Sequence, residues 1–491
     1  MSIFSDKLRT FVKQKGHNIY SLAKYCRMDR SNMYKIVQGT RHPASLEVVE
    51  NIAQSLALTP FERKELLEAW HVSEVGEYIY FERKLIAEFI EHLKAEQTAG
   101  YSEGAGSKGR SLYISEPRPA VSGKNNVNIC LKSMIEKEAQ KETPEICLIC
   151  QPEQSFLLDL LAVFGSHKKN FKIRHLICME SFSEKEENKY NLQCLNDMAP
   201  LLMSSCKYHV YYYYDKVQSH FYNMNILPYM ILTSESVMLI SSDFEYGIYS
   251  KSEEKLSLFH HMFEEYTSET EELFKCGMGI SEILKEYKEV MADRIVAVLC
   301  PGPLSASVPL EISSKYLKRD DKDGELLKSF MEDTGEYVQK CIVRPQYRNF
   351  FTEEGIRDFM DHSHIIDMME SYYETFSEAD RLTVLENMRK MMLEQHVEAH
   401  LIRPGLLHMQ RDFYMTVYEN GRTDMMFKNT DGQWRLLSIH EKSLGESFYN
   451  FTKYLTESTK VCGLEESLQC LEALLEEYRE RFEDCENEEK A

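Results

Sequence analysis

The chain has 491 residues, of which 43% are apolar and 11% aromatic, and it carries a net charge of −21. This composition excludes a disordered chain and predicts two to four folded domains. The sequence has no run of 18 apolar residues, and its start, MSIFSDKLRT, has no apolar leader. We therefore expect a cytoplasmic protein that does not span a membrane. The thirteen scattered cysteines are typical of small buried side chains in a reducing compartment.

The charge is distributed unevenly along the chain. Residues 1–44 hold nine Lys or Arg and two Asp or Glu, a net of +7, so residues 45–491 carry −28. An acidic body repels nucleic acid, but salt limits that repulsion to roughly 8 Å at physiological ionic strength. A basic segment beside an acidic body favours a nucleic-acid contact restricted to the first 44 residues.

The first 72 residues have the pattern of a small domain with five helices. Phe4, Leu8 and Phe11 recur at helical spacing, and Gly16 ends that first helix. Further on, Leu46, Val49, Ala53 and Leu56 form the inner stripe of a fourth helix. Thr59-Pro60-Phe61-Glu62 reads as a capping box with proline at the first helical position, which starts a fifth helix that runs to about Trp70.

Residues 19–44, IYSLAKYCRMDRSNMYKIVQGTRHPA, predict a helix–turn–helix. Asp29 can cap a helix that runs from about Arg30 to Gln38, and Gly39 suits its left-handed C-terminal position. The polar residues expected on the outer face of that helix are Arg30, Ser31, Asn32, Tyr34 and Lys35. In a helix–turn–helix the second helix lies in the major groove of DNA, so this polar face is the expected recognition face.

Residues ~4–70 resemble the Cro/repressor-type (XRE) helix–turn–helix family of bacterial and phage regulators. The matching motifs are Leu22-Ala23, Arg27-Met28-Asp29, Asn32 to Ile36, and Gly39-Thr40-Arg41-His42-Pro43. Two positions depart from the family pattern: Arg27 stands where glycine is usual, and Ile19 where a phosphate-contacting glutamine is common. The resemblance covers about a seventh of the chain.

The resemblance implies a role for each residue of the outer face. Arg30, Asn32 and Lys35 would face base edges, with Ser31 and Tyr34 beside them. Arg41, just past the helix, would hold a phosphate. One helix reads few base pairs, so specific binding predicts a homodimer on two half-sites one helical turn apart.

The rest of the chain predicts a linker and an α/β body. We expect a connecting helix at 73–97, a glycine-rich flexible linker at 98–126, an α/β domain at 127–300 and an α+β domain at 301–491, which ends in helices and serves sensing and dimerisation. Within the body, strands are expected at 146–150, 171–179, 208–214, 413–418, 423–427 and 434–440, and helices at 156–164, 324–341, 353–389, 445–455 and 464–482.

A weak repeat relates the two halves of the body. In each half a strand pair precedes an aromatic-rich helix, at 257–266 and at 447–454. This spacing indicates two related halves, although aromatic residues at helical spacing are also typical of any helix that faces a core.

Three motifs are candidates for chemistry in the body. Cys147 and Cys150 have C-x-x-C spacing, but in a strand they point to opposite faces and no second pair matches them. His396 and His400 would share one helix face, with His362 and His364 as further candidate ligands, but the H-E-x-x-H order is absent. We therefore expect no metal site.

His167-Lys168-Lys169 begins like a phospholipase-D motif. Arg174 stands where the required aspartate would follow, and no Gly-Ser-x-x-Asn comes after it. A catalytic half-site needs that aspartate to orient its histidine, so we predict no catalytic residue and no cofactor.

Two hypotheses of function follow. The first is a sequence-specific transcription regulator that binds a double-stranded DNA operator as a homodimer and responds to an unknown small-molecule or protein effector. The alternative is an enzyme or defence effector whose helix–turn–helix serves targeting or autoregulation. The size of the body keeps the alternative open, and a turnover screen with nucleotides and nucleic acids would discriminate between them.

Overall fold

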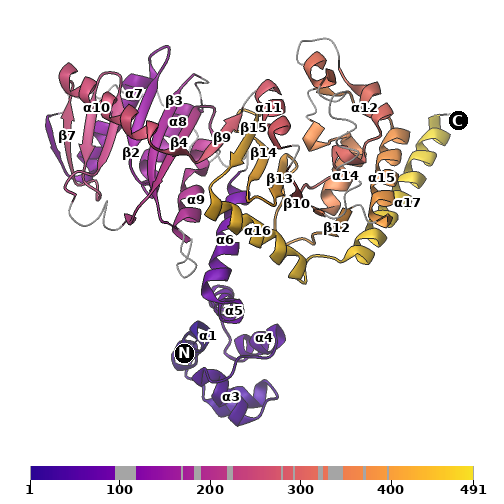
Figure 1. The fold of residues 1–491 in the computed structure, drawn as a ribbon. Coiled ribbons are helices and arrows are strands. Elements are labelled where there is room, and N and C mark those ends of the chain that lie inside the picture. The colour runs from indigo at the N-terminus through magenta and orange to yellow at the C-terminus, as the bar shows by residue number, and fades with distance from the viewer. Residues whose placement is uncertain are drawn as a thin grey trace. The chain divides into compact units, whose positions relative to one another are not determined.

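The computed structural model of the chain describes residues 2–93, 118–166, 168, 170–181, 189–217, 225–277, 280–290, 293–318, 324–329, 347–368, 372–394 and 397–489. The chain divides into two compact units, Met1–Leu85 and Ile86–Ala491 (Figure 1). The first is helical and the second combines helices with two mixed sheets. This confirms the coarse prediction of a helical N-terminal part followed by an α/β part. Of the expected linker, residues 98–117 lie outside the described residues.

The first unit is built from helices packed around one apolar core. They are α1 (Ile3–Gln14), α2 (Ile19–Tyr25), α3 (Arg30–Gln38), α4 (Leu46–Ser55), α5 (Pro60–Val75) and the first part of α6 (Glu77–His92). Leu8, Leu22, Met33, Val49 and Leu66 are fully buried in this core. The helical spacing of the apolar residues therefore places one face of each helix from α1 to α5 in a shared interior.

Helix α5 continues five residues beyond the expected end near Trp70 and stops at Gly76, whose φ of +93° an L side chain rarely adopts. Helix α6 follows directly, and its last part, from Ile86 onward, belongs to the second unit. There Phe89 is fully buried and lies 6.3 Å from the Phe448 ring.

The first sheet of the second unit has eight strands in the order β1-β7-β6-β5-β2-β3-β4-β8. Strands β2, β3 and β4 are parallel, and the remaining neighbours pair antiparallel. The strands are β1 (Ala120–Ser122), β2 (Glu145–Ile149), β3 (Lys172–Met179), β4 (Lys207–Tyr214), β5 (Tyr229–Thr233), β6 (Val237–Ile240), β7 (Tyr246–Ser250) and β8 (Glu271–Glu272). The helices are α7 (Lys124–Ala139), α8 (Ser155–Gly165), α9 (Lys189–Met203) and α10 (Glu253–Ser268).

The second sheet has seven strands in the order β12-β11-β10-β13-β14-β15-β9. The strands are β9 (Phe274–Gly277), β10 (Ile295–Leu299), β11 (Tyr347–Phe351), β12 (Val397–Leu401), β13 (Phe413–Tyr418), β14 (Thr423–Lys428) and β15 (Trp434–Ile439). The helices are α11 (Ile280–Val290), η3 (Ser305–Ser307), α12 (Leu310–Tyr316), α14 (Glu353–His362), η4 (Ile366–Met368), α15 (Glu378–Leu393), α16 (Lys442–Glu457) and α17 (Leu464–Glu489).

The two sheets repeat one topology. In each, three parallel strands are followed by an antiparallel meander of three strands, and an early strand pairs with the last strand of the meander. Thus β1, β2–β4 and β5–β7 correspond in order to β9, β10–β12 and β13–β15. The expected border at residue 300 falls inside this arrangement, because β9 lies before it and completes the second sheet.

Three stretches of the body differ from the prediction. Residues 120–126, expected in the linker, form β1 and the start of α7, because β1 pairs with β7. The helix expected at 353–389 is two helices, since Ser363 adopts a φ of +61° and ends α14. The segment that contains His400, expected to be helical, is strand β12, which pairs in register with β11.

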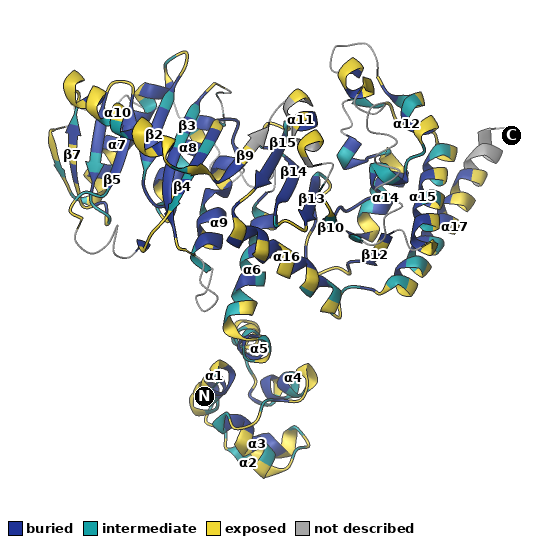
Figure 2. Cartoon of the chain, viewed as in Figure 1, coloured by how far each residue is buried: buried dark blue, intermediate teal, exposed yellow. Residues whose placement is uncertain are grey.

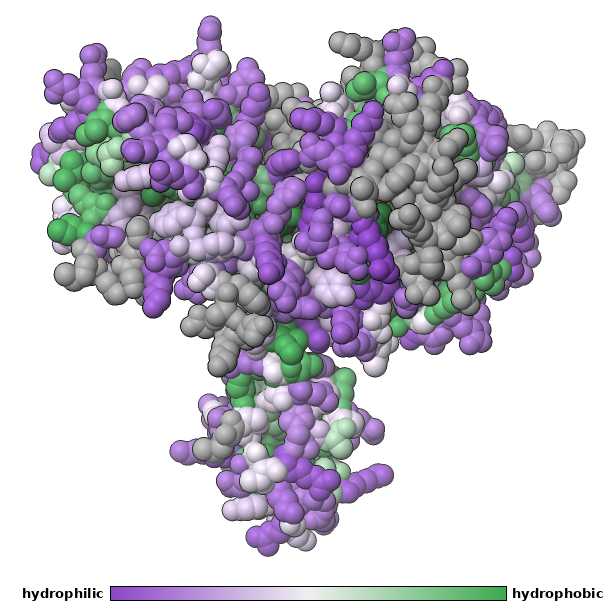
Figure 3. Space-filling view, in the orientation of Figure 1, coloured by the Kyte–Doolittle hydropathy of each residue, from purple (hydrophilic) through white to green (hydrophobic). Residues whose placement is uncertain are grey.

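In the first sheet, β5 is buried along its whole length, whereas exposed and buried residues alternate along β7 (Figure 2). Helix α10 covers one face over β5 and β6 through Leu256 and Phe263. Beyond α10 on that face, Tyr246 and Ile248 of β7 stay exposed, and apolar residues gather near β7 in the space-filling view (Figure 3). Within the described residues, no helix combines the length and apolar character needed to span a bilayer.

Candidate nucleic-acid interface

Helices α2 and α3 are joined by residues 26–29, and their facing sides are apolar. Leu22 and Met33 are fully buried between the helices of the first unit, and Ala23 and Ile36 are nearly so. The small side chain of Ala23 is buried between the helices and leaves room for them to pack closely. Cys26 and Met28 pack against the same core while partly exposed.

The connection between α2 and α3 turns at Arg27, whose φ is +49°. This left-handed conformation costs a residue with a Cβ about 1 kcal/mol, which is why glycine is usual at such a position. The amide of Met28 donates to the Ala23 carbonyl at 2.9 Å, which closes the end of α2. Arg27, which stands where glycine is usual, therefore has the left-handed conformation that glycine adopts most easily.

Both ends of α3 are capped as predicted. The Asp29 carboxylate accepts a hydrogen bond from the Asn32 amide at 2.9 Å, and this satisfies one of the unpaired donors of the first turn. At the other end Gly39 has a φ of +75°. A Cβ at Gly39 would lie 2.5 Å from the Ser5 hydroxyl, so glycine also permits the contact with α1.

The outer face of α3 carries the polar side chains that the sequence singled out. Arg30, Ser31, Tyr34 and Lys35 are all exposed, and Asn32 is half-buried. Tyr34 exposes 53% of its surface, so its ring lies on the outer face together with the polar side chains. The face thus combines two cations, hydroxyl groups and an amide on one short helix.

Arg41 lies beside Asn32, nine residues away in sequence. Arg41 Nη1 donates to Asn32 Oδ1 at 2.6 Å, while Asn32 Nδ2 donates to Asp29 Oδ2. The backbone supports this placement, because the amides of Thr40 and Arg41 both donate to the Lys35 carbonyl. The sequence predicts a base edge as the target of Asn32 and a phosphate as the target of Arg41, and it gives no sign of a contact between the two residues.

Two further tyrosines are exposed on α2, and reasoning from the sequence missed both. Tyr20 exposes 62% and Tyr25 53% of its surface, and Lys24 between them is also exposed. An aromatic residue in the outward positions of a helix otherwise patterned as amphipathic was the signal that could have found them.

The candidate sites of the body have structural partners instead. Cys147 packs in the apolar cluster under α10, whereas Cys150 Sγ lies 3.3 Å from His175 Nε2 on the other side of the sheet. Burial raises the pKa of both thiols, so they stay protonated and are poor metal ligands or nucleophiles. The prediction that this C-x-x-C pair faces opposite ways is therefore confirmed.

The histidines considered as metal ligands have separate hydrogen-bond partners. His400 lies 3.0 Å from the Cys462 carbonyl, His362 lies 2.9 Å from Asp358, and His364 lies 3.2 Å from the Arg411 carbonyl. His396 lies outside the described residues. The part of the chain that the structure describes contains no group of three or more His, Cys, Asp or Glu placed to hold a metal ion.

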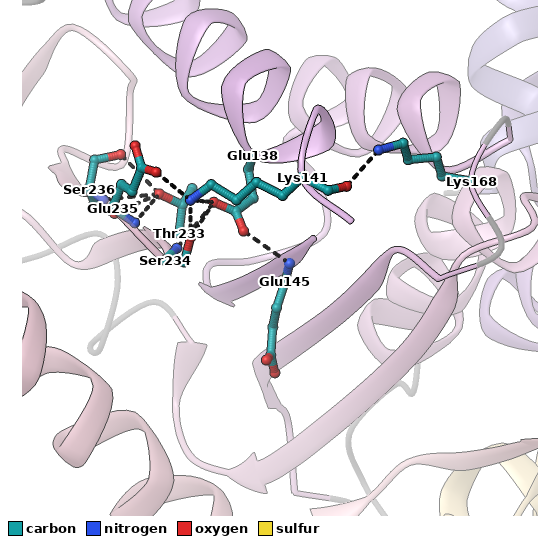
Figure 4. A network of polar contacts seen from close by, with 8 residues as sticks. All are labelled: Glu138, Lys141, Glu145, Lys168, Thr233, Ser234, Glu235 and Ser236. Carbon is teal, nitrogen blue, oxygen red and sulfur yellow. Dashed lines mark hydrogen bonds and ion pairs between the residues drawn. The ribbon is translucent and has the colours of Figure 1, made fainter. Parts of the chain in front are cut away.

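Of the phospholipase-D-like triplet only Lys168 is described, and its ammonium group donates to the Lys141 carbonyl at 2.7 Å (Figure 4). The same network holds the β5–β6 turn. The buried carboxylate of Glu138 accepts hydrogen bonds from the Ser234 amide and hydroxyl, and Lys141 pairs with both Glu138 and Glu235. These groups satisfy one another, and Arg174 is bound to Glu264 in two hydrogen bonds.

No protein-family model matches the chain, and no curated protein matches it. Among solved structures, it aligns with phosphatidylserine synthase from Haemophilus influenzae Rd KW20, with 10% identity over 74% of this chain and 93% of that one, at a TM-score of 0.23. It also aligns with TrmBL2, an archaeal chromatin protein with a novel mode of DNA binding, with 16% identity over 55% of this chain and 99% of that one, at a TM-score of 0.21. Neither similarity is close enough to support an argument about this chain.

Proposed function

We propose that the chain is a sequence-specific DNA-binding regulator of the Cro/repressor (XRE) type, in which α2 and α3 form the helix–turn–helix. The observation that carries this proposal is the outer face of α3, where exposed cations and an oriented amide stand between two intact caps. A helix of this kind fits the major groove of B-DNA, where Arg matches guanine and Asn matches adenine.

The uneven distribution of charge along the chain also supports a DNA-binding role for the first unit. The net +7 of residues 1–44 attracts phosphates, while the net −28 of the remaining residues disfavours DNA contact elsewhere on the chain. A protein with this distribution binds DNA through one limited surface, and its non-specific affinity is kept low.

The proposal includes a homodimer and an effector. One α3 reads too few base pairs to select a genomic site, so two copies bind an inverted repeat with half-sites one helical turn apart. The second unit supplies dimerisation and senses a small-molecule or protein effector. The exposed Arg30 and Lys35 contact bases, with Ser31 and Tyr34 beside them, and Arg41 contacts a phosphate.

The test is retention of genomic DNA fragments by the purified full-length protein at near-physiological salt, followed by sequencing. The proposal expects one recurring inverted repeat. The Lys35→Ala variant is expected to lose the repeat, whereas Lys64→Ala, which removes another exposed cation from α5, keeps it. Recovery of DNA without any shared sequence by the unaltered protein would reject the proposal and turn attention to enzymatic activity in the second unit.

A further inference from the structure

The side-chain amide of Asn32 is held from two sides by groups of opposite character. Asp29 accepts from Asn32 Nδ2, and Arg41 Nη1 donates to Asn32 Oδ1 at 2.6 Å. A carboxylate oxygen can only accept a hydrogen bond here, and a guanidinium can only donate one. The two neighbours therefore exclude the flipped amide, which would place oxygen against oxygen and nitrogen against nitrogen.

This arrangement orients Asn32 without using up its hydrogen-bonding capacity. An amide side chain has two N–H donors and two acceptor lone pairs on its oxygen. Asp29 and Arg41 each occupy one, so one donor and one acceptor remain. Bidentate recognition of adenine in the major groove requires one acceptor for N6–H and one donor for N7.

The backbone makes the position of Arg41 depend on the end of α3. The amides of Thr40 and Arg41 donate to the Lys35 carbonyl at 2.9 and 3.3 Å, after the chain has turned at Gly39. With its backbone held at Lys35, Arg41 can extend its side chain to the first turn of the helix, where Asn32 lies. Asp29 also lies at this first turn, because its carboxylate accepts a hydrogen bond from the backbone amide of Asn32.

We propose that Arg41 is a positioning residue for Asn32, and that Asp29, Asn32 and Arg41 together recognise a single adenine in the major groove. This inference rests on the proposed function, and it adds how the protein selects the base at one position of the operator. A pre-oriented amide loses less conformational freedom on binding than a free one, so part of the discrimination at that base depends on Arg41. Arg41 then serves two roles, since its remaining N–H donors still reach a phosphate.

The experiment measures binding of the full-length protein to a library in which each operator position is varied in turn. Asn32→Ala first identifies the position that Asn32 reads, by its loss of preference there. Arg41→Met is then expected to reduce the preference for adenine at that same position about tenfold, in addition to a uniform loss of affinity. Arg41→Lys, which keeps a donor and the charge, is expected to retain most of the preference.

Two controls separate positioning from charge. Lys24→Met removes an exposed cation from α2 and is expected to lower affinity equally for all sequences. Replacing the adenine by 7-deazaadenine removes the N7 acceptor. This replacement is expected to weaken binding of the unaltered protein more than binding of the Arg41→Met variant. Trp70 fluorescence, measured in a Trp434→Phe background so that it is the one tryptophan of the chain, reports that the first unit is folded in each variant.

The inference is overturned if Arg41→Met lowers affinity uniformly, as Lys24→Met does, and keeps the full preference for adenine. It is equally overturned if Asn32→Ala and Arg41→Met affect different positions. Failure of the proposed function has a different signature, because the unaltered protein would then show no preferred sequence at all.

Discussion

At the scale of single residues, Asp29 joins the stability of α3 to the chemistry of its outer face. Its carboxylate accepts a hydrogen bond from the backbone amide of Asn32, which caps the helix, and another from the side-chain amide of Asn32. A residue with both tasks cannot be exchanged freely for another capping residue. Serine and threonine cap well, but a single hydroxyl oxygen does not reproduce two carboxylate oxygens.

Removal of the Asp29 cap should loosen α3 locally. We expect Asp29→Ala to destabilise the helix by about 1 kcal/mol, which corresponds to about fivefold faster hydrogen exchange of its amides. Exchange measured by mass spectrometry on peptides that cover residues 28–40 tests this, with Asp29→Ser as the control that keeps a cap. Unchanged exchange in Asp29→Ala would mean that tertiary packing alone holds the helix.

His175 is a buried residue whose protonation opposes folding. Its Nε2–H donates to the Cys150 carbonyl at 2.9 Å, and the Tyr208 hydroxyl donates to its Nδ1 at 2.8 Å. Both ring nitrogens are thus matched to a neutral imidazole. Burial lowers the pKa of His175 to about 4, because the charged ring would be desolvated.

This pKa predicts a loss of stability in mild acid. The unfolded chain binds the proton near pH 6.5 and the folded chain only near pH 4, so stability is complete above 6.5 and falls between these values, by about 3 kcal/mol. Urea unfolding followed by circular dichroism at pH 7.5 and pH 5 measures the change. His175→Gln removes the titrating group and should make the pH dependence shallower. An identical slope in this variant would assign the acid sensitivity to other groups.

At the scale of elements, α16 approaches the turn between β13 and β14 closely enough to exclude a side chain. A Cβ at Gly445 would lie 1.7 Å from the Gly421 carbonyl oxygen, which is far inside van der Waals contact. The backbone on both sides is fixed, since Gly421 donates to the Tyr418 carbonyl and Gly445 to that of Glu441. Neither element can yield without losing hydrogen bonds.

We therefore expect Gly445→Ala to destabilise the second unit by about 3 kcal/mol or more. The matched control is Gly463→Ala, because a Cβ at Gly463 meets nothing within 4 Å and the residue is exposed. That variant should be neutral or gain a few tenths of a kcal/mol by restricting the unfolded chain. Thermal unfolding of both variants beside the unaltered protein measures the difference. Equal melting temperatures would show that the α16 contact can relax.

The elements that could be predicted from sequence are those whose signals are local. Asp29, Gly39 and the capping box at Thr59 mark helix ends through contacts within a few residues, and all three occur where expected. Strand β12 depends on its register with β11, some fifty residues earlier, and its alternation was mistaken for a helix face. The break at Ser363 lacks the glycine that usually signals a left-handed helix end.

The features of the candidate interface differ in the same way, because some have local sequence signals and others do not. The exposed positions of α3 follow from helical periodicity once its caps are known. The bond between Asn32 and Arg41 does not, because it depends on how the chain leaves Gly39 and folds back over the helix. A polar contact nine residues apart has no periodic signature in the sequence.

At the scale of the whole molecule, the repeated topology divides the second unit into two halves joined by polar contacts. Arg435 of β15 is almost fully buried and donates to the Cys206 carbonyl at 3.0 Å, at the start of β4. Asn429 donates to the Ser205 hydroxyl at 3.2 Å. The Arg435 guanidinium therefore joins β15 to the first half through buried hydrogen bonds from Nη2, and the two halves belong to one compact unit.

The proposed dimer sets how DNA binding responds to salt. Each phosphate contact contributes about −0.9 to the slope of log affinity against log salt concentration, so an inverted repeat bound by two copies should have about twice the slope of a single half-site. Arg41→Ala should reduce the slope by about 0.9 on a half-site and twice that on the repeat. Lys64→Ala, on α5, should leave both slopes unchanged. Fluorescence anisotropy between about 50 and 200 mM salt measures them. Equal slopes on the repeat and on the half-site would show that one copy of the chain binds alone. The second unit would then not serve to hold two first units on the same DNA site.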